Sequence, residues 1–140
     1  MIRQSLLGMA LVLLAGCVSQ QQGTLYERLG EREGIDRIVA RFIVSIESEP
    51  RVAKHFEATD LDRFYDKLAE HICFLADGPC EYTGDSMVDV HTGMNITEAE
   101  FNLLAEMVLD AMDKENIPHP TQNDLIARLV PLRSEVIYLQ

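Results

Sequence analysis

The sequence predicts an all-α domain. After Gly23, apolar residues recur at spacings of three and four, which places them on one face of a helix. No stretch in this part of the chain shows the strict alternation of apolar and polar residues that is typical of strands. With 140 residues and a hydrophobic content of 47%, the chain is long enough to form one domain with a buried core.

Three helices are predicted in the first half of the domain. A short helix at residues 25–29 comes first, and a second begins near Gly34 and ends before Pro50. A short turn then leads to a third helix over residues 61–76, which ends at the Asp-Gly-Pro sequence at 77–79.

The second half contains a short helix and two longer ones. The short helix covers residues 85–92. Thr97 and Glu100 have the spacing of a capping box, which predicts that the next helix begins there. The last helix is expected over residues 121–138, with a kink at Pro131. The domain therefore has about five main helices joined by short turns.

The first residues have the order of a secretory signal: the basic Arg3, an apolar run, and a small-residue cleavage site. The run is too short to span a bilayer as a stable helix. Because it ends in Leu-Ala-Gly-Cys, it resembles the lipobox of bacterial lipoproteins, in which the cysteine, here Cys17, is lipidated. We therefore expect a signal peptide at 1–16, a lipidated and polar tether at 17–23, and a folded domain at 24–140. An uncleaved anchor and a chance apolar start are the alternatives.

The expected location is the bacterial cell envelope. Val18 and Ser19 follow the cysteine in place of the Asp often linked to retention at the inner membrane. This favours the outer membrane, with the domain facing the periplasm. The net charge of −11 and the lack of a Lys/Arg cluster make nucleic acid a poor partner.

Among the four histidines, His91 has the most informative surroundings. The sequence has no serine-histidine-aspartate order, phosphate-binding loop or paired-cysteine motif to suggest another chemistry. His91 lies on the short helix, between a turn that contains Tyr82 and the capped apolar helix. A haem needs one neutral imidazole on such an element, in an apolar slot between helices.

Several motifs together resemble group I truncated haemoglobins. They are Leu-Tyr-Glu-Arg-Leu-Gly at 25–30, Gly-Pro at 78–79, Tyr-Thr-Gly at 82–84, Val-His-Thr-Gly at 90–93 and Val-Pro-Leu at 130–132. The resemblance covers about residues 24–137 and implies a two-over-two helical sandwich around haem b. It also implies reversible binding of O₂, CO or NO with a reductant that is not identified. Whether the protein also carries out NO dioxygenation or another redox reaction stays open.

The resemblance assigns site residues by position. His91 matches the proximal iron ligand, Lys67 matches a basic residue on a haem propionate, and Tyr82 matches a tyrosine at the haem edge. The residues expected to pack on the haem are Phe56, Phe64, Leu68, Met87, Ile96 and Phe101.

The distal side departs from the family pattern. Ile43 and Leu68 stand where many members have a tyrosine and a glutamine, and the other distal candidate, Phe64, is also apolar. Without a hydrogen-bond donor, we expect CO to be favoured over O₂. His71 and Lys67 are the candidates to enter the pocket as a donor or as a sixth iron ligand.

Three alternatives remain open from the sequence. Cys73 and Cys80 either form a disulfide or leave Cys73 as a small buried apolar residue. The domain could act as a haem-based sensor, or haem-holding module, through a separate partner. It could also be a haem-free helical lipoprotein that serves as an interaction domain.

Overall fold

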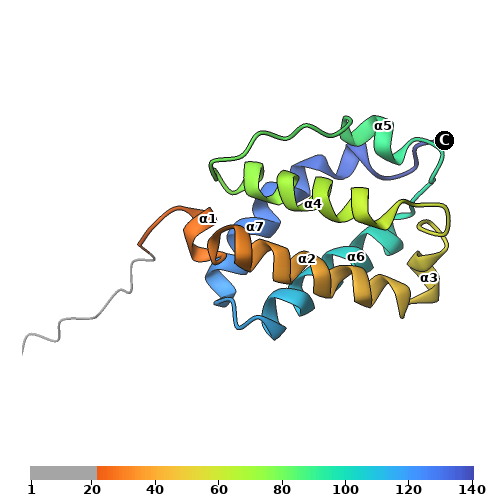
Figure 1. Ribbon diagram of the computed structural model, residues 1–140. Coiled ribbons are helices and arrows are strands. Elements are labelled where there is room, and N and C mark those ends of the chain that lie inside the picture. The colour runs from red at the N-terminus through yellow and green to blue at the C-terminus, as the bar shows by residue number, and fades with distance from the viewer. Residues whose placement is uncertain (1–21) are drawn as a thin grey trace, which may run out of the picture.

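The computed structural model describes residues 22–140, and within them the predicted all-α fold is confirmed (Figure 1). Our expectations for the signal peptide and for Cys17 concern residues outside this range. The helices of the described residues are α1 (Leu25–Arg28), α2 (Glu31–Glu47), α3 (Pro50–Ala53), α4 (Leu61–Leu75), α5 (Met87–His91), α6 (Glu98–Lys114), α7 (His119–Leu129) and the 3₁₀ helix η1 (Val130–Glu135). None of the helices in residues 22–140 has the length and apolar character needed to cross a membrane.

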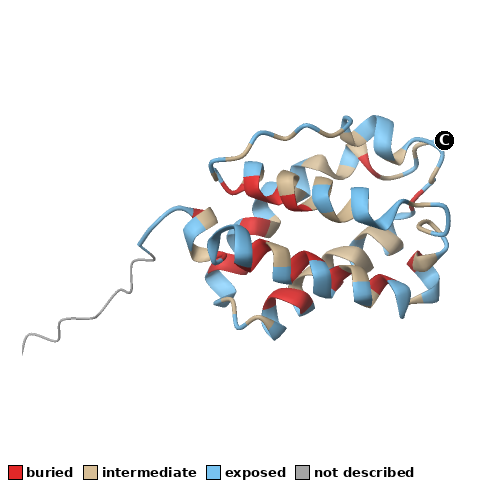
Figure 2. Ribbon diagram, in the orientation of Figure 1, coloured by how far each residue is buried: buried red, intermediate tan, exposed pale blue. Residues whose placement is uncertain are grey.

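The core forms where α2 packs against α4 on one side and α6 on the other (Figures 1 and 2). Burial of apolar side chains is the main stabilising contribution to such an interface. Large side chains that are completely or almost completely buried include Leu29, Ile35, Ile38, Val39, Val52, Ile72, Met112 and Leu125. With α7 packed on α6, the four long helices form the two pairs of a two-over-two sandwich.

Local capping explains where the helices begin. The predicted capping box is confirmed, because the Thr97 hydroxyl accepts from the Glu100 N–H and the Glu100 carboxylate accepts from the Thr97 N–H. α2 begins at Glu31, about one turn before the predicted start. Its first turn is polar, so the apolar periodicity cannot mark it. Gly30, with φ +88°, provides the left-handed residue that turns the chain into this helix.

The prediction for the last helix is wrong at both ends. α7 begins at His119, because Pro120 occupies the first turn, where a missing N–H costs no hydrogen bond. It ends at Leu129, and the tighter η1 helix begins at Val130, with Pro131 in its first turn. Beyond η1 the chain forms an isolated bridge between Ile137 and Ile96, and the Tyr138 N–H donates to the Ile96 carbonyl at 2.9 Å. The C-terminus therefore closes over the segment that follows α5.

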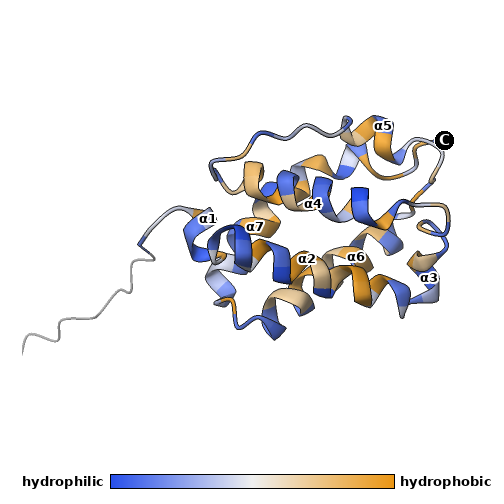
Figure 3. Cartoon of the chain, in the orientation of Figure 1, coloured by the Kyte–Doolittle hydropathy of each residue, from blue (hydrophilic) through white to orange (hydrophobic). Residues whose placement is uncertain are grey.

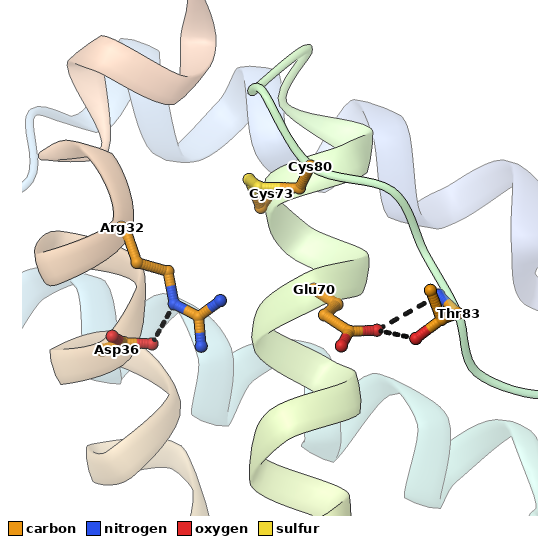
Figure 4. Close-up of a disulfide and its surroundings, with 6 residues drawn as sticks. All are labelled: Arg32, Asp36, Glu70, Cys73, Cys80 and Thr83. Carbon is orange, nitrogen blue, oxygen red and sulfur yellow. Dashed lines mark hydrogen bonds and ion pairs between the residues drawn. A yellow bond between two sulfur atoms is a disulfide. The ribbon is translucent and has the colours of Figure 1, made fainter.

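A disulfide joins Cys73 of α4 to Cys80, with their Cα atoms 6.0 Å apart (Figure 4). Of the two alternatives for this pair, the structure has the disulfide, and the bonded Cys73 is also fully buried. The bond fixes the beginning of the 79–86 segment to the end of α4. This segment then runs along α4 to the start of α5 (Figure 1).

Candidate functional site

A cavity of about 300 Å³ lies among α4, the 79–86 segment and α5. It brings together six of the ten residues that the sequence predicted for the site. They are Phe64, Lys67, Leu68, Tyr82, Met87 and His91. His71, which the sequence named only as a candidate to enter the pocket, also lines the cavity. The remaining lining residues include Arg63, Asp85 and Val90.

The other four predicted residues lie elsewhere. Ile43 and Phe56 line a second cavity of about 220 Å³ between α2, α3 and the start of α4. Phe64 lines both cavities and is therefore their common wall. Ile96 is buried and forms a bridge with the C-terminal segment, and Phe101 is half-buried on α6, so neither lines these cavities.

The His91 ring is held by its own helix. Nδ1 lies 2.7 Å from the Met87 carbonyl oxygen. A carbonyl only accepts, so Nδ1 carries the hydrogen and Nε2 has the free lone pair. Burial lowers the pKa of His91, although the bond to Met87 acts in the opposite direction. The ring is therefore a neutral imidazole with one nitrogen available to bind a metal.

Local caps and one contact with the C-terminal segment set the position of α5. The Ser86 hydroxyl accepts from the Asp89 N–H at 3.1 Å and caps the start of the helix. At the other end, Gly93 adopts φ +86°, which turns the chain away directly after His91. The Gly93 N–H donates to the Leu139 carbonyl at 3.2 Å. The C-terminal segment thus helps to place the histidine-bearing helix.

His71 faces the same cavity from α4. Its ring centroid lies 4.8 Å from that of Tyr82, and the two rings are tilted by 38°. Burial lowers the pKa of His71, and a positive charge on His91 would lower it further. The cavity therefore contains two imidazoles, and both favour the neutral form.

Polar pairs tie the 79–86 segment to α4 at the rim of the cavity. Glu70 accepts from the Thr83 N–H at 3.1 Å and from the Thr83 hydroxyl at 2.9 Å (Figure 4). The Lys67 ammonium donates to the two Glu70 oxygens at 2.9 and 3.0 Å and to Thr83 Oγ1 at 2.7 Å. The bonds from Lys67 and Thr83 lower the pKa of Glu70 to about 2. Lys67 is thus a cation held at the edge of an apolar cavity.

Sequence reasoning missed a second link at the other end of the segment. Arg63 donates to the Asp85 carboxylate at 2.8 Å, and the Tyr82 hydroxyl donates to the Asp85 carbonyl at 2.7 Å. Arg63 and Asp85 are 22 positions apart, so no local spacing could have indicated the pair. The apolar stripe of α4 predicted only the apolar wall of the cavity and not these polar contacts.

The comparisons with known proteins identify the family. Residues 24–138 match the bacterial-like globin family. The chain belongs to this family. The globin fold accounts for the arrangement of this site, in which the half-buried His91 on the one-turn helix α5 faces a cavity that the longer helix α4 lines from the other side.

Curated relatives of this globin are group 1 truncated haemoglobins, which bears out the resemblance seen in the sequence. The chain is 28% identical over 124 residues to group 1 truncated hemoglobin GlbN of Mycolicibacterium paratuberculosis, covering 89% of this chain and 91% of the relative. It is 24% identical over 114 residues to the group 1 truncated hemoglobin of Tetrahymena pyriformis, covering 81% of this chain and 94% of the relative.

Solved structures share the fold of this globin. The truncated hemoglobin of Tetrahymena pyriformis in its Fe(III) form aligns with a TM-score of 0.80 at 23% identity, covering 83% of this chain and 99% of that one. The 2/2 hemoglobin of Synechococcus sp. PCC 7002, solved with covalently attached heme, aligns with a TM-score of 0.77 at 21% identity, covering 82% of this chain and 98% of that one. The predicted two-over-two fold is therefore confirmed.

Membership in the globin family implies haem as the cofactor and diatomic gases as ligands. The residues present fit a haem. His91 offers a neutral imidazole with Nε2 available, and Phe64, Leu68 and Met87 provide apolar walls. Lys67 places a positive charge at the rim, where a haem carboxylate could pair with it.

Proposed function

We propose that this globin is a haem b protein that reversibly binds O₂, CO or NO, with His91 as the proximal iron ligand, and that a lipid on Cys17 holds it at the bacterial cell envelope. One observation carries the proposal for the haem. The His91 ring is locked through Nδ1 to the Met87 carbonyl at 2.7 Å and lines an apolar cavity with its other nitrogen uncommitted.

Other lining residues would hold the haem in place. The haem supplies the iron to which a gas molecule binds. Phe64, Leu68 and Met87 would pack against its apolar faces. Tyr82 would lie at its edge, held by its bond to the Asp85 carbonyl. Lys67 would pair with a propionate, because its ammonium is already positioned at the rim by Glu70.

The remaining predicted residues have a less direct role in this proposal. Ile43 and Phe56 would shape the apolar cavity behind Phe64, where a small apolar gas finds room. Ile96 and Phe101 would support the surrounding core. Since Ile43, Phe64 and Leu68 lack a donor, they favour CO over O₂ compared with relatives that have a distal tyrosine.

The lipid anchor rests on the sequence at 1–17. An apolar run that ends in Leu-Ala-Gly-Cys provides both the export signal and the modified cysteine. Each buried methylene of an acyl chain contributes about 0.8 kcal/mol to membrane binding. We place the domain on the periplasmic side of the outer membrane.

The assignment of His91 is tested by replacing it. His91→Ala removes the only imidazole that the short helix offers, so purified protein should lose stable haem and its Soret band. His119→Ala is the matched control, because that side chain is 81% exposed and lies far along the chain on α7. Full haem retention by His91→Ala, with an unchanged spectrum, would rule out the assignment.

The anchor is tested by Cys17→Ser in cells that make the full chain. The wild type should fractionate with membranes, and the variant should be released from them. His91→Ala serves as the control, since it leaves residues 1–23 unchanged and should stay with the membranes. The anchor proposal fails if the wild type fractionates with soluble cytoplasmic proteins.

A further inference from the structure

The C-terminal segment holds the turn that directly follows α5. We infer that Tyr138 is a positioning residue for His91. Its backbone, in a left-handed conformation, closes a clasp of residues 137–139 over the turn at 93–96 and so fixes the histidine in the cavity. This inference deepens the proposed function and rests on His91 as the proximal iron ligand.

The short helix α5 does not fix its own position. It has five residues and none of them is buried, so neither its length nor its packing makes it stable by itself. The Ser86 cap holds only its first turn. The end that carries His91 therefore depends on what holds the turn at 93–96.

The clasp holds this turn through backbone hydrogen bonds. The Leu139 carbonyl accepts from two N–H groups of the turn, that of Gly93 at 3.2 Å and that of Asn95 at 3.0 Å. In the other direction, the Tyr138 N–H donates to the Ile96 carbonyl at 2.9 Å. The clasp is therefore bonded to both ends of the turn.

Tyr138 makes these bonds in an unusual backbone conformation. Its φ is +57°, a region that bulky residues rarely adopt. The residue is 56% exposed, so packing does not impose this conformation. Its hydroxyl lies 3.4 Å from the Glu98 nitrogen, which is long for a hydrogen bond. Strain of this kind persists only where the surroundings impose it, and the backbone bonds to the turn do so here.

The clasp acts on the turn and not on the core. Apart from two bonds to Arg133, the backbone hydrogen bonds of residues 136–140 go to residues 93–96 and to no core helix within the described chain. Arg133 itself is paired with Glu98 at 2.7 Å, which joins η1 to the beginning of α6 independently of the clasp. Opening the clasp should therefore release the turn and leave the packing of the core helices intact.

A fixed His91 has two consequences for a bound haem. The imidazole loses little freedom when it binds the iron, because the clasp has already ordered it, and preorganised ligands bind more tightly. The bond between the iron and Nε2 also takes one geometry instead of several. Opening the clasp should therefore weaken haem retention and make the iron–histidine bond heterogeneous.

The test compares two substitutions at one position of the full chain. Tyr138→Pro removes the N–H that bonds to Ile96 and fixes φ at about −65°, so the clasp cannot close. Tyr138→Gly removes the same side chain, keeps the N–H and tolerates a positive φ, so the clasp is retained. The difference between the two variants separates the backbone clasp from the side chain.

The iron–histidine bond is measured by resonance Raman spectroscopy of the ferrous, gas-free protein. Its stretching band should broaden in Tyr138→Pro and match the wild type in Tyr138→Gly. Haem transfer to an excess of a scavenger protein should be about tenfold faster for Tyr138→Pro, as expected when one or two hydrogen bonds are lost. Removal of residues 138–140 is the second variant should Tyr138→Pro fold poorly, and it should have the same effects.

Hydrogen exchange of the haem-free chain tests the clasp without the cofactor. The amides of Gly93 and Asn95 should exchange faster in Tyr138→Pro than in the wild type or Tyr138→Gly, because they lose the Leu139 carbonyl. Core amides of α2 should exchange alike in all three.

Three results would overturn the inference. They are an unchanged stretching band and haem release in Tyr138→Pro, the same changes in Tyr138→Gly as in Tyr138→Pro, and unchanged exchange of the Gly93 and Asn95 amides in Tyr138→Pro. A wild type with no Soret band would overturn the proposed function as well. A haem-loaded wild type that Tyr138→Pro matches in every measurement would overturn this inference alone.

Discussion

The half of the molecule built on α2, α6 and α7 differs sharply from the half built on α5 and the 79–86 segment. The first half is filled by apolar side chains, among which Ile35, Val39 and Leu125 are completely buried. In the second half, α5 has no buried residue, although part of it is hydrophobic (Figures 2 and 3). Its Val88 and Val90 are 43% and 45% exposed. The apolar core stops where the cavity begins.

Polar and covalent links take the place of a core in the second half. The Cys73–Cys80 disulfide, the Glu70–Thr83 bonds and the Arg63–Asp85 pair all join α4 to the 79–86 segment. Such links fix the position of a segment without filling the space beneath it. The difference indicates that the second half is completed by its cofactor, whereas the first half is complete by itself.

Haem loading should have the largest effect on stability, and the stabilised residues should be confined to one half of the molecule. A ligand that binds only the folded state at a free concentration 1,000 times its Kd stabilises it by about 4.1 kcal/mol. Hydrogen exchange should show increased protection mainly in α5 and the 79–86 segment. Some α2 and α6 amides exchange by local opening and not by global unfolding. An equal gain in the protection of these amides would contradict the division into two halves.

Leu125→Ala should cost the haem-free protein about 3 kcal/mol of unfolding free energy, because it leaves a cavity in a filled core. Val90→Ala is the control in the other half and should change it by less than about 0.5 kcal/mol, since that side chain is 45% exposed. Urea unfolding measures both. Similar losses for the two variants would mean that the halves are packed alike.

Cys80→Ala should cost about 2 kcal/mol, because the disulfide closes a short loop in the unfolded chain. The variant should also release haem faster, since the 79–86 segment loses its fixed point on α4. Haem transfer to an excess of a scavenger protein measures this release. Reducing the wild type should reproduce both effects, and the reductant should have no effect on Cys80→Ala.

The smallest expected effect concerns acid. Lys54 and the Thr97 N–H, together with weaker contributions, lower the pKa of Glu100 from 4.5 to about 2. The unfolded chain therefore takes up this proton first, so the stabilisation is present above pH 4.5 and is lost as the pH falls toward 2. We expect this stabilisation to be about 1 kcal/mol or less, as for ion pairs near a surface.

Glu100→Gln should flatten this part of the dependence of unfolding free energy on pH, measured in urea from pH 6 to pH 3. Glu81→Gln is the control, because Glu81 is an exposed carboxylate on the 79–86 segment. An equal flattening in the control would show that general surface charge, and not the Glu100 cluster, causes the acid sensitivity.

The parts of the fold that could be predicted depend on neighbours in the chain. The Thr97–Glu100 capping box is a contact over three residues, and the apolar stripe of α4 is a repeat over three and four. A second capping box, in which Thr24 and Glu27 begin α1, was equally readable and was missed. The position of the C-terminus could not be predicted, because its partner, the Ile96 carbonyl, lies some 40 residues away along the chain.

For the site, the sequence by itself determined the residues that carry the chemistry, while the tertiary structure decided which of them meet. His91 and its neighbours stand out through local motifs, and six of the predicted residues do share one cavity. Only the folded chain places His71 in that cavity, moves Ile43 and Phe56 into the adjoining one, and ties Lys67 to Glu70 and Thr83. Periodicity tells which side of a helix is apolar. Which cavity a side chain enters depends on the packing of α4 against α2 and the 79–86 segment, and contacts between distant residues determine that packing.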